Sequence, residues 1–472
     1  MSVRILQGSV FDKLPEIERG SVDVVCTSIP YWKLRSYLKA DHPLKPFELG
    51  DEKTPEEYID NQVKVFRLVR GCLADHGVCW INVGDTYCDD SKHGGMTSGK
   101  HVSALHGPSI IRNKRTSGVP AGNMALIPQR LAIALQADGW IVRSVVAWTK
   151  PAPMPQSVSG WRWTRCRVKV ASGDRMGSGK QSEHRLTAGL NERTAEKKAF
   201  TTDGKPHGAR AENGKDFSSR AQWSDCPGCP KCEPHGGYVL RKGSWRPTSS
   251  WEPILMLAKT GDYFADGEGV KTALAAATVG RDKYTRIIDD HDEQFAVRHD
   301  HETICSGANL RDTWRIAAEP LSSAHYAAFP TEIPRLCIKA SVSENGNCPA
   351  CGMPWVRVID KPVVGCFHDH EGDGEKYGNR QNGKGPLSGA DYAASGLQGK
   401  TIAWRPSCAC IGNDIMTPRP PVVMDPFCGS GRTGVAAKML GCDFIGIELN
   451  PEYVAMSESI LGDVMPLFSG DA

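Results

Sequence analysis

The chain has 472 residues, of which 40% are hydrophobic, and a formal net charge of +3. This length exceeds one average domain, so we expect a large catalytic unit that carries insertions. No apolar run reaches the length of a membrane span, and the N-terminus lacks the apolar stretch of a signal peptide, so we expect a soluble cytoplasmic protein. The small net charge does not by itself indicate a protein that binds nucleic acid, so any basic surface must be confined to part of the chain.

Apolar segments of strand length alternate with helical patterns in the first part of the chain. Residues 21–28 form an apolar run that ends in small polar residues, which is typical of a buried parallel strand. Residues 56–73 carry apolar side chains at helical spacing after the start signal Thr54-Pro55, and predict a helix. The same reasoning predicts strands at 77–83, 140–148 and 254–258 and a helix at 128–137.

At the far end, strands predicted at 422–424 and 444–447 flank a glycine-rich turn and a helix at 435–440. Alternation of this kind predicts an α/β fold with a parallel sheet and helices on both faces. Three polar, glycine-rich stretches interrupt the pattern, and we interpret them as insertions or long loops. These stretches are residues 91–123, 159–246 and 341–417.

The segment DPFCGSGRTG, residues 425–434, follows an apolar strand and opens a helix. Its glycines at 429, 431 and 434 let the backbone turn sharply and approach a ligand closely. Glu448 lies 17 positions after Gly431, at the end of the strand FIGIE. An acid in that position can hold ribose hydroxyls, as it does in dinucleotide-binding folds.

The hexapeptide TSIPYW, residues 27–32, directly follows the first predicted strand, at a sheet edge where α/β proteins bind ligands. The Ser28 hydroxyl and the Ile29 carbonyl could accept the two hydrogens of an exocyclic amino group and make its nitrogen nucleophilic. Pro30 would keep the turn rigid. Tyr31 would offer a face to a base extruded from a duplex.

With its catalytic motif before its cofactor motif, the chain resembles the beta class of DNA amino-methyltransferases, which includes N4-cytosine and N6-adenine enzymes. The usual motif of that class is Ser/Asp-Pro-Pro-Tyr, from which this chain departs at Ile29. ILQGSVFDKL is similar to the family's N-terminal segment, although the family often has Asp where Ser9 stands. HYAAFPTEIPRLCI is similar to a cofactor-contacting segment and points to His325, Phe329 and Pro330. GWIVRSVVAWTKPAPMPQSV and SWRPTSSWEPILMLAKTGDYF are similar to the family's middle segments.

The resemblance implies a Rossmann-like fold with a circularly permuted motif order, and site-specific methylation of double-stranded DNA by S-adenosylmethionine, as in restriction–modification systems. Ser28 favours N4 of cytosine, because adenine enzymes usually carry Asp there. The catalytic residues are then Ser28, Ile29, Pro30 and Tyr31. The cofactor-binding residues are Asp425, Pro426, Phe427, Gly429, Gly431, Glu448 and Asn450, together with Phe329 and Pro330.

Two cysteine clusters lie in the insertions, and close cysteine pairs in an intracellular chain suggest a metal. Cys348-Pro-Ala-Cys351 and Cys408-Ala-Cys410 would complete a tetrahedral, structural zinc site. The other cluster, which comes first in the chain, holds Cys226, Cys229 and Cys232, with Cys166 or His235 as a fourth ligand. We favour Cys166, because its segment recurs with this cluster in similar proteins.

The first Cys-rich insertion also interleaves basic and aromatic residues, which suits phosphate contact and base stacking. These residues are Trp161, Arg162, Trp163, Arg165, Arg167 and Lys169. We predict that this insertion takes part in target recognition, and residues 266–311 are a second candidate for that role. The expected organisation is a catalytic half at 1–158, the recognition insertion at 159–246, a continuation of the catalytic domain at 247–340, a zinc-ribbon-like insertion at 341–417 and a cofactor-binding half at 418–472.

Three alternatives stay open at this point. The first is N6 of adenine as the target instead of N4 of cytosine, and the second is RNA or a protein amide as the substrate, because the amino-transfer chemistry is shared. A zinc-containing DNA-binding protein that has lost catalysis is a further alternative, with Ile29 and Ser9 as its signs. A homodimer and a partner restriction endonuclease are compatible with the class and are left open.

Overall fold

The computed structural model describes residues 1–34, 36–39, 41–88, 118–153, 159–171, 222–272, 308–319, 330–360, 400–410 and 417–464. Within these residues the chain forms two compact units. The first unit combines residues 1–152 and 250–472, and the second unit spans residues 153–249. No helix in the described part of the chain combines the length and apolarity that a membrane crossing needs.

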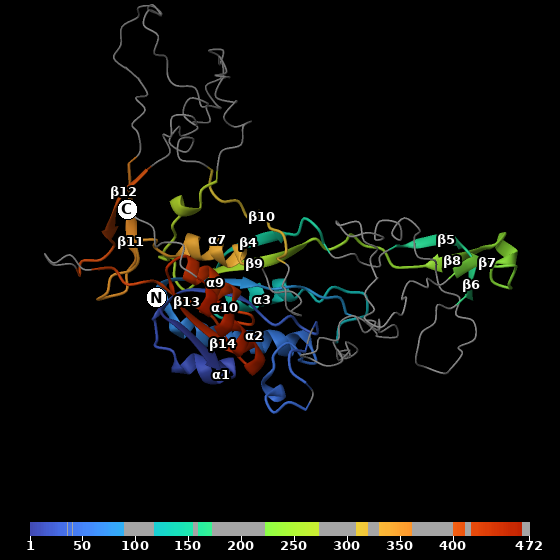
Figure 1. Ribbon diagram of the computed structural model, residues 1–472, viewed down its shortest axis with the longest axis horizontal. Coiled ribbons are helices and arrows are strands. Elements are labelled where there is room, and N and C mark those ends of the chain that lie inside the picture. Colours follow the sequence, from blue (N-terminus) through green and yellow to red (C-terminus); the bar gives the residue numbers. More distant parts are fainter. Residues whose placement is uncertain are drawn as a thin grey trace, which may run out of the picture. The chain divides into compact units, whose positions relative to one another are not determined.

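An eight-stranded sheet is the centre of the first unit (Figure 1). Its strand order is β1-β14-β13-β2-β3-β9-β4-β10. The strands are β1 (Val3–Gln7), β2 (Val22–Ser28), β3 (Leu73–Asn82), β4 (Ile141–Thr149), β9 (Trp251–Ala258), β10 (Thr313–Arg315), β13 (Val422–Asp425) and β14 (Asp443–Glu448).

The sheet is mixed, so the expectation of an all-parallel sheet is wrong at one strand. β9 pairs antiparallel with both β3 and β4, whereas the other described pairs of this sheet are parallel. The reason is topological. The chain leaves the sheet after β4 and returns directly beside it, where the Lys150 amide donates to the Ser250 carbonyl at 2.7 Å. A strand that begins beside the end of β4 can pair along β4 only in the opposite direction.

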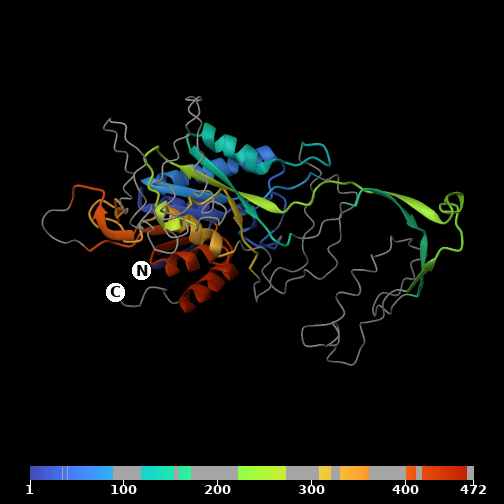
Figure 2. The same cartoon turned by 90° about the horizontal axis from the view of Figure 1, so that it is seen from above.

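Helices cover both faces of the sheet (Figure 2). One face packs against α1 (Val10–Lys13), α2 (Pro55–Cys72) and α3 (Ile127–Ala137). The other face packs against α7 (Glu332–Ser341), α9 (Arg432–Met439) and α10 (Pro451–Asp463).

Alternation along each strand supplies both cores, because successive strand side chains point to opposite faces. In β3, Cys79 and Ile81 lie in the core beneath α2, while Trp80 lies in the core beneath α7. These side chains are almost fully buried on both faces of the sheet, which explains why this part of β3 is a continuous apolar run in the sequence.

The helix α2 begins where the sequence predicted. The Thr54 hydroxyl accepts a hydrogen bond from the Glu57 amide at 3.1 Å, and Pro55 occupies the first helical turn. Tyr58, Phe66 and Val69 form part of its buried face. This helix therefore anchors the segment that follows β2, which contains the predicted catalytic motif.

Three further antiparallel pairs lie in the regions expected to be insertions. β11 (Trp355–Asp360) pairs with β12 (Lys400–Pro406) in the first unit. In the second unit β5 (Trp161–Arg165) pairs with β8 (Tyr238–Lys242), and β6 (Arg167–Ala171) pairs with β7 (Gln222–Asp225).

Candidate functional site

A pocket at the carboxyl ends of β2, β13 and β14 is lined by both predicted motifs. Segments more than 390 positions apart in sequence, such as Ser28 and Glu448, meet there because β13 pairs with both β2 and β14. Of the predicted site residues, the pocket is lined by Ser28, Ile29, Pro30, Tyr31, Pro426, Phe427, Gly429, Glu448 and Asn450. Ser9 lines the same pocket from the start of α1.

A buried asparagine organises the catalytic motif. The side-chain oxygen of Asn82 accepts hydrogen bonds from the Ser28 hydroxyl at 3.1 Å and from the Tyr31 hydroxyl at 2.8 Å. Its amide nitrogen donates to the Pro253 carbonyl at 3.3 Å, which fixes the orientation of the side chain. Because the Ser28 hydroxyl is the donor in its hydrogen bond with Asn82, the lone pairs of the serine oxygen can accept hydrogen bonds from a ligand in the pocket.

The single proton of the Tyr31 hydroxyl is shared between Asn82 and a second acceptor. The hydroxyl contacts the Glu252 carboxylate at 2.7 Å, and that carboxylate also forms an ion pair with Lys150. Burial and the negative charge of Glu252 raise the pKa of Tyr31 well above its usual range. The phenol therefore stays protonated and acts as a hydrogen-bond donor that fixes the ring.

The Tyr31 ring lies directly against the backbone of Gly84. A Cβ atom built on Gly84 would be 2.2 Å from the Tyr31 ring, closer than any real contact. Glycine at this position therefore lets the ring occupy its place beside the pocket.

The motif residues between Ser28 and Tyr31 are fixed by backbone contacts. Ile29 is buried, and its amide donates to the Asn82 carbonyl at 3.2 Å. The Pro30 carbonyl accepts a hydrogen bond from the Tyr58 hydroxyl at 2.8 Å, which ties the motif to α2. The isoleucine that departs from the family pattern therefore packs its side chain in the core.

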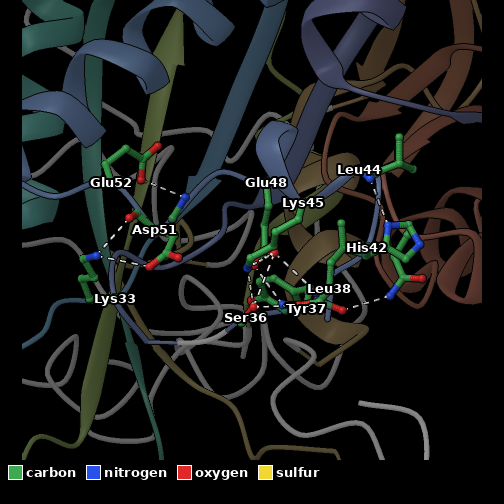
Figure 3. Close-up of polar contacts among 12 residues, drawn as sticks. Lys33, Ser36, Tyr37, Leu38, His42, Leu44, Lys45, Glu48, Asp51 and Glu52 are labelled. Atoms are coloured by element: carbon green, nitrogen blue, oxygen red, sulfur yellow. Dashed lines mark hydrogen bonds and ion pairs between the residues drawn. The ribbon is translucent and has the colours of Figure 1, made fainter. Parts of the chain in front are cut away.

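Described residues of the loop between the catalytic motif and α2 line one side of the pocket. Polar contacts join several residues of this loop (Figure 3). Its centre is Glu48, whose carboxylate accepts from the Tyr37 amide at 2.9 Å and pairs with Lys45 at 2.5 Å. Leu34 and Phe47 line the pocket from this loop while remaining about half exposed. The loop therefore gives the pocket an apolar mouth.

Glu448 bridges the two segments of the cofactor motif. One carboxylate oxygen accepts from the Gly429 amide and the other from the Asn450 amide, both at 2.8 Å. Burial raises the pKa of Glu448 to about 7, against the effect of these amide donors. Each oxygen retains a further lone pair, so the carboxylate can still accept hydrogen bonds from a ligand.

Asp425 and Gly431 shape the turn without lining the pocket. The Asp425 carboxylate accepts from the Phe427 amide at 3.0 Å and from the Thr433 hydroxyl at 2.7 Å, and burial raises its pKa to about 6. Gly431 has a φ of 80°, and a Cβ there would be 3.1 Å from Ser457 of α10. Both residues therefore stabilise the turn that presents its neighbours to the pocket.

Gly434 has a different role from the one the sequence suggested. It lies inside α9, and a Cβ there would be 2.7 Å from the ring of Phe444. This glycine permits close packing of helix on strand and takes no part in the turn. Pro330 is buried but does not line the pocket. Phe329, His325, most of 91–123 and residues 273–307 of the second recognition candidate lie outside the described residues.

The structure brings the cysteines together in two clusters of four. In each cluster the four sulfur atoms lie within 4.8 Å of one another. A zinc ion with sulfur ligands at about 2.3 Å separates them by roughly 3.8 Å, so both clusters fit a tetrahedral metal. The clusters are Cys166, Cys226, Cys229 and Cys232, and Cys348, Cys351, Cys408 and Cys410.

Backbone amides prepare one sulfur in each cluster to be a thiolate. The Lys231 and Cys232 amides lower the pKa of Cys229 to about 7, and the Cys351 and Ala350 amides do the same for Cys348. Of the two sequence candidates for the fourth ligand, Cys166 lies in the first cluster. The ring of His235 instead lies 4.8 Å from the ring of Trp163.

Sequence reasoning missed Asn82, Glu252 and the pocket-lining Glu48. Asn82 is the last residue of β3 and the penultimate residue of the strand predicted at 77–83, so a polar residue near a strand's carboxyl end was the available signal. Glu252 offered no comparable signal, because it lies one residue after the start of β9 and reaches Tyr31 only through the sheet.

The chain matches a family described as DNA methylase over residues 22–171 and 414–459. Type II methyltransferase M.Cfr9I of Citrobacter freundii is 23% identical over 450 residues, which cover 95% of this chain and 84% of the relative. M.SmaI of Serratia marcescens is also 23% identical, over 458 residues that cover 97% of this chain and 90% of the relative. M.XycI of Xanthomonas campestris pv. cyanopsidis is 33% identical over 154 residues, 33% of this chain and 48% of the relative.

The family match contains both motifs that line the pocket, and two relatives align over nearly the whole chain. The matched family and these relatives are DNA methyltransferases, and the chain resembles the family in both motifs. It is therefore an enzyme, a DNA methyltransferase, and the resemblance read from its motifs is confirmed.

Proposed function

We propose that this enzyme transfers the methyl group of S-adenosylmethionine to N4 of cytosine in duplex DNA. The observation that carries the choice of base is the Ser28–Asn82 hydrogen bond. It makes the hydroxyl oxygen of Ser28 a neutral acceptor beside the pocket. In the family that the motif resembles, adenine enzymes usually carry a carboxylate at this position.

The cofactor would occupy the part of the pocket lined by the glycine turn. Glu448 lies there with acceptor capacity for ribose hydroxyls, between Gly429 and Asn450. Phe427, which follows the carboxyl end of β13, lines the same part of the pocket and would offer an aromatic face to the cofactor. When bound, S-adenosylmethionine supplies the electrophilic methyl group.

The chain's own residues would activate the amino nitrogen. The Ser28 oxygen and the Ile29 carbonyl accept its hydrogens, and these hydrogen bonds strengthen as positive charge develops on nitrogen. Tyr31 holds the extruded base against its ring, with its hydroxyl fixed by Asn82. No covalent intermediate with the enzyme is needed, because the amino nitrogen is itself the nucleophile.

Both cysteine clusters would hold structural zinc. Four thiolate ligands leave no open coordination position, so neither metal would take part in the chemistry. The second unit and the β11–β12 pair offer small cores, and a metal can supply the folding free energy that such cores lack. The recognition role of the 159–246 insertion is part of the same proposal.

The decisive experiment is mass spectrometry of nucleosides from duplex DNA methylated by the purified protein. The proposal expects N4-methylcytosine at defined sites in cofactor-dependent amounts. N6-methyladenine would retain the enzyme class and overturn the choice of base. DNA binding without any methylated nucleoside, despite cofactor binding, would favour the alternative that catalysis has been lost.

A further inference from the structure

One face of the β5–β8 pair carries exposed aromatic and cationic side chains. Strand alternation and the register place three cross-strand pairs on this face. They are Trp161–Lys242, Trp163–Leu240 and Arg165–Tyr238, and we call them the β5–β8 face. All six side chains are exposed, Trp161 to 68% and Trp163 to 51%.

Single exposed aromatics are ordinary, but a contiguous exposed group marks a surface with a partner. Here the rings are arranged with cations. The Lys242 ammonium lies 4.8 Å from the centre of the Trp161 ring, and the Arg165 guanidinium lies 5.7 Å from that of Tyr238. The face therefore presents flat apolar surface and positive charge together.

The charge of the second unit favours a polyanionic partner. Among its side chains that the structure describes, seven are cationic and two are acidic. The cations are Arg162, Arg165, Arg167, Lys231, Arg241, Lys242 and Arg246, and the acids are Asp225 and Glu233. Asp225 is shared by Arg165 at 2.7 Å and Arg167 at 3.7 Å, so that group keeps a net positive charge.

The shape of the β5–β8 pair indicates which kind of polyanion it would bind. The major groove of B-DNA admits a two-stranded antiparallel ribbon, and such ribbons read base edges with the side chains of one face. The base of this ribbon is tied down, because the Cys166 amide donates to the Gly237 carbonyl at 2.8 Å and the Cys226 amide to the Cys166 carbonyl at 2.8 Å. A rigid ribbon loses little conformational entropy on binding.

We propose that the β5–β8 face enters the major groove of duplex DNA and supplies target recognition. The proposal rests on the proposed function only in taking DNA as the substrate. Trp161 and Trp163 would contact base edges and thymine methyl groups. Lys242 would contact a phosphate, since it lies at the end of the face and has a flexible stem.

The test compares the full-length parent with a Trp161→Ala/Trp163→Ala variant, with Lys242→Gln and with a control, Arg143→Gln. Arg143 is an exposed arginine of the first unit that lies 5.2 Å from the centre of the Tyr263 ring, a contact like that of Arg165. Fluorescence anisotropy would measure binding to a labelled random-sequence duplex and to its single strand. Calorimetry with S-adenosylmethionine and thermal melting would show that each variant is folded.

We expect the tryptophan variant to bind duplex about tenfold or more weakly, the usual cost of truncating aromatic anchors at an interface, while keeping the parent's cofactor affinity and melting temperature. Lys242→Gln should reduce the slope of log affinity against log salt by about 0.9, the value for one phosphate contact, and Arg143→Gln should leave it unchanged. Methylation sites mapped in DNA should be lost or relaxed in the tryptophan variant.

Parental duplex affinity and parental methylation sites in the tryptophan variant would overturn the proposal. So would a loss confined to single-stranded DNA, or a change from dimer to monomer with DNA affinity intact. If the variant loses duplex binding but even the parent methylates nothing, the recognition surface stands and the proposed function fails.

Discussion

The Tyr31 hydroxyl donates a hydrogen bond to the side-chain oxygen of Asn82 across 2.8 Å. The same oxygen accepts the Ser28 hydroxyl, so one buried amide fixes both polar groups of the motif. The strand β3 thus positions the residues that follow its neighbour β2. Asn82 is a positioning residue, because it reaches the pocket only through Ser28 and Tyr31.

Asn82→Ala should lower the rate of methyl transfer by about 100-fold, because small displacements of reacting groups have effects of that size. The substitution also removes the partner of the Ser28 hydroxyl, whereas Tyr31 keeps its contact with Glu252, so the loss of stability should be about that of one hydrogen bond, roughly 0.5–1.5 kcal/mol. Single-turnover methylation and calorimetry would measure the effects, with cofactor affinity expected to stay at the parental value. Asn123→Ala is the matched control, since Asn123 is exposed and its side-chain amide donates to the Pro120 carbonyl, outside the pocket.

Substitutions in the motif should separate activation from base capture. Ser28→Ala removes an acceptor used mainly in the transition state, so the chemical rate should fall more than DNA affinity. Tyr31→Ala should cost about 1–3 kcal/mol of base stacking, whereas Tyr31→Phe keeps the ring and should retain most of that affinity. If Ser28→Ala and Tyr31→Ala both methylate duplex DNA at the parent's rate in single-turnover assays, the reaction centre lies elsewhere.

Gly84→Ala should inactivate the enzyme without adding any polar group. The new methyl group would lie 2.2 Å from the Tyr31 ring, so the ring must leave its place beside the pocket. Gly261→Ala is the control, because no atom lies within 4 Å of a Cβ there. Methylation assays should show loss in the first variant alone, with cofactor binding retained in both. Parental activity of Gly84→Ala would contradict the role given to the ring position.

Cofactor affinity should depend on the protonation of Glu448. Its pKa of about 7 lies above the ordinary glutamate value, so the carboxylate is ionised above pH 7 and protonated below it. If the ionised form accepts ribose hydroxyls, affinity should be constant above pH 7 and fall by up to about tenfold for each unit below it. Calorimetry across this range would test this, with Glu448→Gln expected to bind weakly and without the same pH dependence. An identical pH profile in that variant would assign the dependence to the ligand.

The same pKa shift has a consequence for folding. Because the folded state holds the Glu448 proton up to about pH 7 and the unfolded state releases it near the ordinary value, this group stabilises the fold below the unfolded pKa. That contribution is lost as pH rises toward 7. The melting temperature of the ligand-free protein should therefore show a Glu448-dependent decrease over this window, which Glu448→Gln should remove.

Purified protein should contain two zinc ions per chain, one for each cysteine cluster. Cys348→Ser should remove one of them and destabilise the β11–β12 region, while cofactor binding persists. Elemental analysis would count the metal, and Cys442→Ala provides a control cysteine outside both clusters. Metal-free native protein, purified without chelators, would remove both assignments.

Local sequence patterns were sufficient for much of this fold. The strand predicted at 21–28 is β2 (Val22–Ser28), and the helix predicted at 56–73 is α2 (Pro55–Cys72). These predictions succeed because strand and helix periodicities and N-terminal caps are set by residues close together in the chain. The motifs beginning at Thr27 and Asp425 were identified for the same reason.

Tertiary structure decided what depends on residues distant in sequence. A short apolar run such as 254–258 is compatible with a parallel or an antiparallel strand. The antiparallel direction of β9 therefore could not be predicted from the sequence. The approach of Glu252 to Tyr31 spans 221 positions and exists only through the pairing of β9 with β3. Cys166 joins a cluster 60 positions away because two strand pairs bring it there. Local patterns identified the chemical groups of the site. The order of strands in the sheet fixed which of these groups meet, because hydrogen-bonded strands bring together residues that local patterns cannot connect.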